Sequence, residues 1–164
     1  MSSATTLPFF EAAADHRGFD FSGISIRVIV PSKATGGTFA MFDERTVPKG
    51  GPPLHVHEHQ IEVFRVLEGS YEFMIAGQRY QAGPGDTAVV PAGAEHGFWN
   101  TGETEGRLLF TLSPGADAEE VFRDLEPFLV ADGPPDVAGI NQAFAARGFR
   151  IVGPPLAALL GGGP

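Results

Sequence analysis

Glycine and proline punctuate this chain more densely than any other feature of its sequence. Its 164 residues include 22 glycines and 14 prolines, spread along the chain so that they separate short apolar stretches. Short stretches of this kind between turn formers are typical of a β-sandwich or barrel. We therefore expect an all-β core with strands at Ile24–Val30, Thr38–Arg45, Leu54–His57, Glu62–Leu67, Tyr71–Ile75, Arg79–Gln81, Thr87–Val90, His96–Asn100 and Arg107–Leu112.

The pattern changes after residues 113–115. Apolar residues recur at helical spacing within Asp117–Val130, where Pro127 is expected to kink or end the helix. A second helix is predicted at Asp136–Arg147, since Gly148 provides a C-terminal stop. A last short strand is expected at Phe149–Val152, and the GGGP tail is expected to fray.

The length is that of one domain, residues 1–164. We expect a barrel core over about 22–114 and a helical appendage with a tail over 115–164.

Charge and cysteine content exclude several classes of function. The net charge of −9 argues against nucleic acid and anionic membranes as partners, because both require a basic face. Without cysteine there is no disulfide, no thiolate metal site and no cysteine nucleophile. The N-terminus lacks the pattern of a secretory signal, and no apolar run reaches the length of a membrane helix. We therefore expect a cytoplasmic protein.

Three of the five histidines lie in one stretch, LHVHEHQIEVFRVLEG, at residues 54–69. Residues two apart on a strand point to the same side, so His55 and His57 project together, as two ligands of one ion would. Glu62 follows His57 by five residues and can face the same ion only if a turn or bulge breaks the strand within 58–61. Such a break removes His59 from the candidate ligands and leaves it in solvent or in contact with a ligand. An unbroken strand would add it to the ligands.

A second stretch, GDTAVVPAGAEHGFWN at residues 85–100, supplies another histidine. One strand ends at Val90, the chain turns at 91–93, and His96 begins the next strand. His96 would then come from a different part of the sheet, which is typical of a site built inside a barrel. The H-x-H pair alone is weak support for a metal, because paired histidines are common on polar strands.

The two stretches together resemble the two signature motifs of the cupin superfamily, in particular its small, single-domain, quercetin dioxygenase-like members. The first motif is carried by Gly50, His55, His57, Glu62 and Gly69. The second is carried by Gly85, Pro91, Gly93, His96 and Asn100. The first motif departs from the family in one respect, since four residues rather than five separate its leading glycine from the first histidine. That glycine serves a turn, so the departure leaves the ligands undisturbed.

This resemblance implies a double-stranded β-helix, or jelly-roll barrel, that binds one divalent transition metal per chain. The implied ligands are His55, His57, Glu62 and His96. Imidazole and carboxylate ligands suit iron, manganese, nickel, cobalt, copper or zinc and do not select among them. Such a site leaves positions open for water, dioxygen or a chelating substrate. Glu62 can act as both ligand and proton acceptor, which makes it the candidate catalytic residue.

Strand alternation predicts the surroundings of the metal. If His96 faces inward, Phe98 and Asn100 do too, and Glu62 brings Phe64 and Val66 with it. One of Phe73 and Met74 also faces in. The predicted substrate pocket consists of Phe64, Val66, Phe73, Phe98 and Asn100. For any single one of these aromatic residues, packing in the barrel core is the commoner role.

The strand at Thr38–Arg45 leaves two alternatives for its inner face. One contains Phe39, Met41 and Asp43, and the other contains Ala40, Phe42 and Glu44. In either case the inward residues include no arginine or lysine clamp, which speaks against a nucleotide-sugar epimerase.

Three classes of function follow. The first is a quercetinase-like dioxygenase acting on a small aromatic or enolic substrate that chelates the metal. The second is a non-oxidative isomerase, lyase or decarboxylase in which the ion stabilises an enolate. The third is a non-catalytic module that binds a metal or small ligand. Fold and ligands together do not decide among them.

The expected partners are a small-molecule substrate or ligand and a second copy of the chain. Small cupins of this type commonly form homodimers through sheet edges. The apolar segment Leu7–Phe10 could add a strand to another subunit and cover an edge, or pack on its own barrel.

Overall fold

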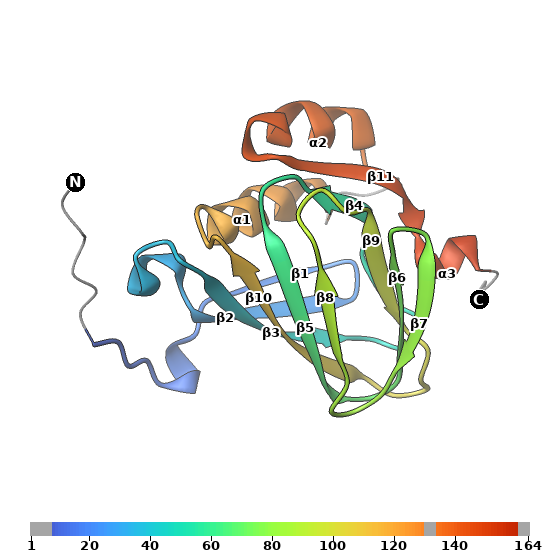
Figure 1. Cartoon of the computed structure of the whole chain (residues 1–164), viewed down its shortest axis with the longest axis horizontal. Helices are drawn as coiled ribbons and strands as arrows, with labels where there is room; N and C mark the ends of the chain where they lie inside the picture. Colours follow the sequence, from blue (N-terminus) through green and yellow to red (C-terminus); the bar gives the residue numbers. More distant parts are fainter. Residues whose placement is uncertain (1–7, 130–133, 161–164) are drawn as a thin grey trace.

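The computed structural model describes residues 8–129 and 134–160, which form two antiparallel sheets facing each other. Figure 1 shows the sheets as the two walls of a barrel. The six-stranded sheet has the order β1-β2-β3-β10-β5-β8, with bounds Gly18–Phe21, Ile24–Val30, Ala40–Thr46, Gly106–Ser113, Ile61–Glu68 and Thr87–Val90. The five-stranded sheet has the order β11-β4-β9-β6-β7, with bounds Phe149–Pro155, Pro53–His57, His96–Asn100, Tyr71–Ile75 and Gln78–Ala82.

The predicted all-β core is confirmed. All nine predicted barrel strands are present, each within two residues of its predicted ends. The two sheets form the jelly roll, and their inner faces meet in an aromatic core. Phe42 and Phe110 stack there with ring centroids 4.8 Å apart, and Phe64 lies 5.7 Å from Phe110.

The strand β1 is not predicted by the sequence pattern. β1 contains the sequence GFDF, whose glycine and aspartate are poor strand formers. It pairs with β2 as an edge strand across a tight turn at Ser22 and Gly23, both of which have positive φ. Tertiary pairing therefore overrides a weak local preference.

The helical appendage follows the barrel as predicted, with local differences. α1 spans Ala118–Leu129 and continues two residues past Pro127, so the expected kink or stop at this proline does not end the helix. α2 spans Val137–Phe144, and the 3-10 helix η3 continues it over Ala145–Arg147. Asp136 caps α2 by accepting a hydrogen bond from the backbone N–H of Gly139 at 2.9 Å.

Short helical segments were not predicted. These are η1 at Ala13–Asp15, η2 at Ser32–Thr35 and α3 at Leu156–Leu159. The last strand is also longer than expected, since β11 runs on to Pro155. The predicted fraying tail at 161–164 and the predicted helix end at Val130 lie outside the described residues.

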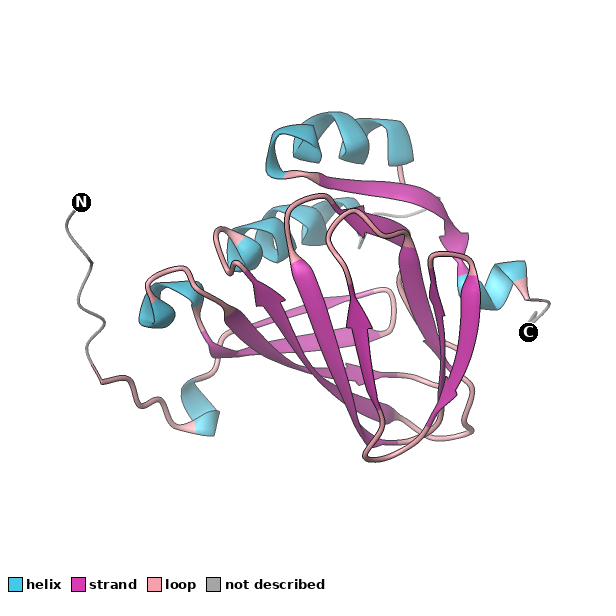
Figure 2. Cartoon of the chain, in the orientation of Figure 1, coloured by secondary structure: helices cyan, strands magenta, loops and turns pink. Residues whose placement is uncertain are grey.

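The two longer helices, α1 and α2, lie at one end of the two sheets, as Figure 2 shows. α1 packs against β1, and α2 packs against β11. Their buried faces form a second apolar cluster of Val121, Leu125, Ile140, Phe144, Phe149 and Ile151. The appendage thus covers one end of the barrel. None of the described helices combines the length and the apolar character that crossing a bilayer requires.

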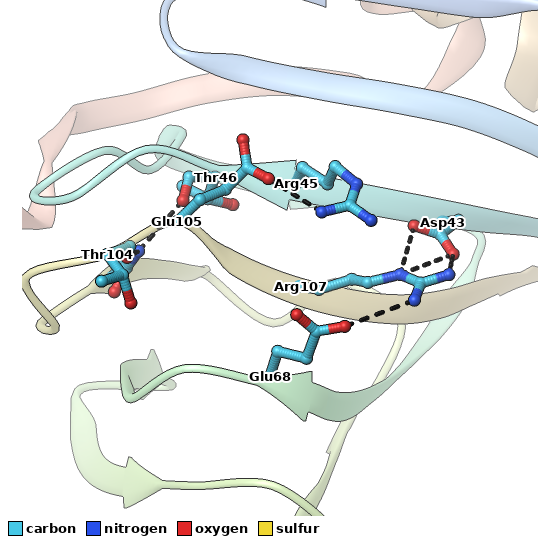
Figure 3. A network of polar contacts seen from close by, with 8 residues as sticks. Asp43, Arg45, Thr46, Glu68, Thr104, Glu105 and Arg107 are labelled. Atoms are coloured by element: carbon cyan, nitrogen blue, oxygen red, sulfur yellow. Dashed lines mark hydrogen bonds and ion pairs between the residues drawn. The ribbon is translucent and has the colours of Figure 1, made fainter.

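The outer face of β3 carries charged residues in ion pairs. Arg107 on β10 contacts Asp43 with an Nε–Oδ1 distance of 3.0 Å and Glu68 with an Nη1–Oε1 distance of 3.4 Å (Figure 3). Arg45 pairs with Glu105 at 2.8 Å. Since Asp43 and Arg45 face outward, the inner face of β3 is the alternative with Ala40, Phe42 and Glu44, all of them buried.

The N-terminal segment contains no strand over residues 8–10. Phe9 is 44% exposed and Phe10 is 92% exposed, so the ring of Phe10 does not pack on its own barrel. Leu7 lies outside the described residues.

Candidate metal centre

The four predicted ligands come from both walls of the barrel. β4 carries His55 and His57 on one face, and β9 places His96 directly opposite His55. β4 ends at His57 and β5 begins at Ile61, so the predicted break lies between them. The chain crosses to the other sheet in this interval, and Glu62 therefore faces the three imidazoles across the barrel.

The ligand atoms of these residues all lie within 4.8 Å of one another. Glu62 Oε2 is 2.8 Å from His96 Nε2 and 3.7 Å from His57 Nε2. All four side chains are buried. His59 is exposed and lies outside the cluster, which agrees with its expected separation from the other histidines.

Backbone carbonyls fix the orientation of two of the rings. His55 Nδ1 lies 2.8 Å from the Pro53 carbonyl, and His96 Nδ1 lies 2.9 Å from that of Ala94. A carbonyl only accepts, so both Nδ1 atoms carry hydrogen, and in the neutral rings Nε2 keeps its lone pair. This is the arrangement in which metal-binding histidines are usually held.

A backbone contact joins the two motifs. The N–H of Gly93 donates to the His57 carbonyl at 2.8 Å, and Gly93 has a φ of 79°, which glycine adopts at little cost. Gly51 lies against the backbone of β9, where a side chain would come within 2.1 Å of the Phe98 carbonyl oxygen. These glycines allow the close approach that places the ligands together.

Burial and the carboxylate of Glu62 together set the charge states of the three imidazoles. Burial lowers the pKa of His55 well below its usual value, and repulsion from protonated His96 and His57 adds to this. Burial also lowers the pKa of His57. Burial alone would lower the pKa of His96, but the hydrogen bond and charge of Glu62 outweigh it and raise this pKa. Burial thus favours neutral His55 and His57, the form that binds a transition metal, whereas metal binding would displace the proton that the raised pKa of His96 favours.

The cluster opens into a cavity of about 230 Å³. Of the predicted pocket residues, Phe64 and Phe98 line it. α1 contributes Phe122, Leu125 and Leu129, which the sequence had indicated only as an apolar helix face. The cavity wall is mainly apolar. Among the described residues that line it, Glu44 is the one ionisable side chain outside the metal centre.

Three predicted pocket residues lie elsewhere. Val66 and Phe73 line a different hollow, between β7 and β8. The Asn100 side chain donates to the carbonyls of Thr46 at 3.0 Å and Thr104 at 2.8 Å, and it accepts from the Gly102 N–H at 2.9 Å. Asn100 thus faces inward as expected but holds loops together, so the predicted pocket is corrected at these three positions.

Residues 43–116 match the cupin domain family, and this segment contains all four predicted ligands. This part of the chain is a cupin domain. The chain is 30% identical over 96 residues to quercetin 2,3-dioxygenase of Bacillus subtilis (strain 168). That match covers 56% of this chain and 27% of the dioxygenase, so the chain spans about a quarter of the relative's length.

Solved structures share the fold of the cupin domain and its surroundings. KdgF from Halomonas sp. superposes with a TM-score of 0.61 at 20% identity, over 69% of this chain and 99% of that one. A predicted oxalate decarboxylase from Thermotoga maritima gives a TM-score of 0.60 at 18% identity, over 64% of this chain and 98% of that one. These likenesses show the fold, which proteins with different names share.

The donor set fits one transition ion. Three imidazole nitrogens and one carboxylate oxygen converge from two sheets, and two of the rings are held by backbone carbonyls. The hydrogen bond between His96 and Glu62 joins two atoms that would both become ligands. This geometry suits a divalent ion without identifying it.

Proposed function

We propose that this chain is a metal-dependent dioxygenase that acts on a small aromatic or enolic compound. The observation that carries the proposal is the opening of the three-histidine, one-glutamate cluster into a mainly apolar, aromatic-lined cavity. The similarity to a quercetin dioxygenase over 96 residues supports the same chemistry. A bound redox-active metal would supply Lewis acidity and electron transfer to dioxygen.

The residues of the chain would serve this reaction in distinct ways. The cavity walls, including Phe64 and Phe98, would hold the flat body of the substrate and keep water away from it. Glu62 is buried and faces the cavity, so its carboxylate would accept the proton of the substrate's enol hydroxyl. Deprotonation gives the substrate the negative charge that favours chelation through adjacent oxygens.

The test combines metal loading with oxygen consumption. Metal-free protein is loaded separately with iron(II), manganese, nickel, cobalt, copper or zinc and supplied with 3-hydroxyflavone or acetylacetone. We expect oxygen uptake with at least one redox-active ion and none with zinc, which has no redox chemistry. The matched controls are the double variant His57→Ala/His96→Ala, which removes two ligands, and Glu62→Gln, which removes the proton acceptor.

The outcome also separates the other two functions. Turnover of an enolic substrate without oxygen consumption, or equal rates with zinc, would replace the dioxygenase by a non-oxidative isomerase, lyase or decarboxylase. Tight binding without turnover with any ion would indicate a binding module.

A further inference from the structure

Glu44 is a second buried carboxylic acid in the cavity, apart from the metal centre. It lies on the inner face of β3, in register with Ile26 on β2 and Leu108 on β10, and is 4% exposed. Its side chain lines the same cavity as the metal cluster. Glu44 is not among the four clustered ligands, so the metal centre does not account for its burial.

The Glu44 carboxyl is only partly satisfied by its neighbours. Thr46 Oγ1 donates to Glu44 Oε1 at 2.9 Å, while Oε2 has no hydrogen-bond partner among residues 8–129 and 134–160. The other buried glutamate outside the metal centre, Glu72, contacts Arg79 and accepts a hydrogen bond from Trp99. Glu44 thus has an unused oxygen on the wall of a cavity.

Burial raises the pKa of Glu44 to about 8, with the charge of Glu62 adding to the effect and the Thr46 hydrogen bond opposing it. The carboxyl is therefore mostly neutral at pH 7. A neutral carboxylic acid has one hydroxyl donor. Since Oε1 accepts from Thr46, the proton belongs on Oε2, the oxygen without a partner.

We propose that Glu44 determines substrate specificity by donating a hydrogen bond to an acceptor oxygen at the end of the substrate remote from the metal centre. This inference rests on the proposed function, because it assumes that the metal centre holds the chelating end. The substrate class is then an aromatic compound with adjacent chelating oxygens at one end, an apolar body, and a hydroxyl or carbonyl oxygen at the other.

Sheet register supports two separate anchor points. Glu62 on β5 is level with Leu112 on β10, which is level with Ala40 on β3. Glu44 lies four residues further along β3, a backbone offset of about 13 Å at about 3.3 Å per residue. The aromatic ring of Phe98 and the side chain of Ile26 line the same cavity and would contact the apolar body of the substrate.

The experiment measures binding apart from turnover. Protein loaded with zinc is titrated by calorimetry with 3-hydroxyflavone and with analogues that each carry one additional hydroxyl at a different ring position. In the wild type we expect one analogue to bind about tenfold more tightly than the parent, the effect of one buried hydrogen bond. Glu44→Gln keeps a donor and should retain this preference, whereas Glu44→Leu should abolish it. Both variants should keep their zinc.

A preference that persists in Glu44→Leu, or binding of the whole series with equal affinity in the wild type, overturns the role of Glu44. Failure of every member to bind overturns the two-anchor assignment as well. Normal binding preferences without oxygen uptake by the iron-, manganese-, nickel-, cobalt- or copper-loaded protein would overturn the dioxygenase proposal and leave Glu44 in place.

Discussion

Glu44 should give this protein a stability that falls as pH rises. In the unfolded chain its pKa is the ordinary 4.5, whereas burial raises it to about 8 in the fold. Between these values the unfolded state releases a proton that the folded state keeps, so the free energy of unfolding decreases with pH. Below pH 4.5 Glu44 is protonated in both states, so its titration no longer changes the free energy of unfolding.

The magnitude follows from the width of this window. Each pH unit over which only the unfolded chain is ionised costs about 1.4 kcal/mol. From pH 5 to pH 7 the wild type should therefore lose about 2.5 kcal/mol relative to Glu44→Gln, whose amide has a similar shape and does not ionise. Titrations of other groups are common to both proteins and largely cancel in the difference.

The assay is urea unfolding of metal-free wild type and Glu44→Gln at several pH values between 5 and 7. Glu72→Gln provides the control, because contact with Arg79 lowers the pKa of that buried glutamate. Glu72 is ionised in both states over most of this window, so the difference between the wild type and Glu72→Gln should stay nearly constant. Parallel stability profiles for wild type and Glu44→Gln would refute a neutral Glu44 and the hydrogen-bond donor inferred from it.

Three further predictions concern the metal, a loop and assembly. Purified wild type should carry close to one transition ion per chain by elemental analysis, and His57→Ala/His96→Ala should carry none; a wild type that stays metal-free after supplementation with several divalent ions would contradict the site. Asn100→Ala should lower the free energy of unfolding by about 1–3 kcal/mol in urea titrations, because it leaves two carbonyls and an N–H without partners, whereas a role in the pocket would instead change substrate affinity. We propose that the chain forms a homodimer, and a monomer mass in light scattering at micromolar concentration would reject this.

The cluster of three histidines and one glutamate was accessible from the sequence, because strand geometry is rigid. Spacing of two residues placed His55 and His57 on one face, and the odd spacing to Glu62 required a break that the structure has between β4 and β5. The same reasoning separated His59 from the cluster. Joining His96 to these residues needed the family resemblance, since pairing of β4 with β9 depends on contacts far apart in the sequence.

The lining of the cavity was less accessible, because alternation predicts which face a side chain takes but not which interior space it meets. Val66 and Glu44 are both level with Leu108, and both face inward. Glu44 nevertheless lines the cavity into which the metal centre opens, whereas Val66 lines the hollow between β7 and β8. Phe64 and Phe98, with ring centroids 5.3 Å apart, line the cavity at the metal centre and not the hollow between β7 and β8.

The inner face of β3 could not be chosen from the sequence alone, because the contacts that decide it join residues far apart in the chain. Asp43 faces outward to Arg107, sixty-four residues later in the chain, and this places Glu44 inside. Ion pairs at a partly exposed site contribute little stability, so the apolar packing of Ala40 and Phe42 is the stronger reason for this orientation. Burial of Glu44 is then a cost imposed by the strand's alternation. A buried acid costs free energy unless its hydroxyl has a hydrogen-bond partner, and a substrate oxygen in the cavity would provide one.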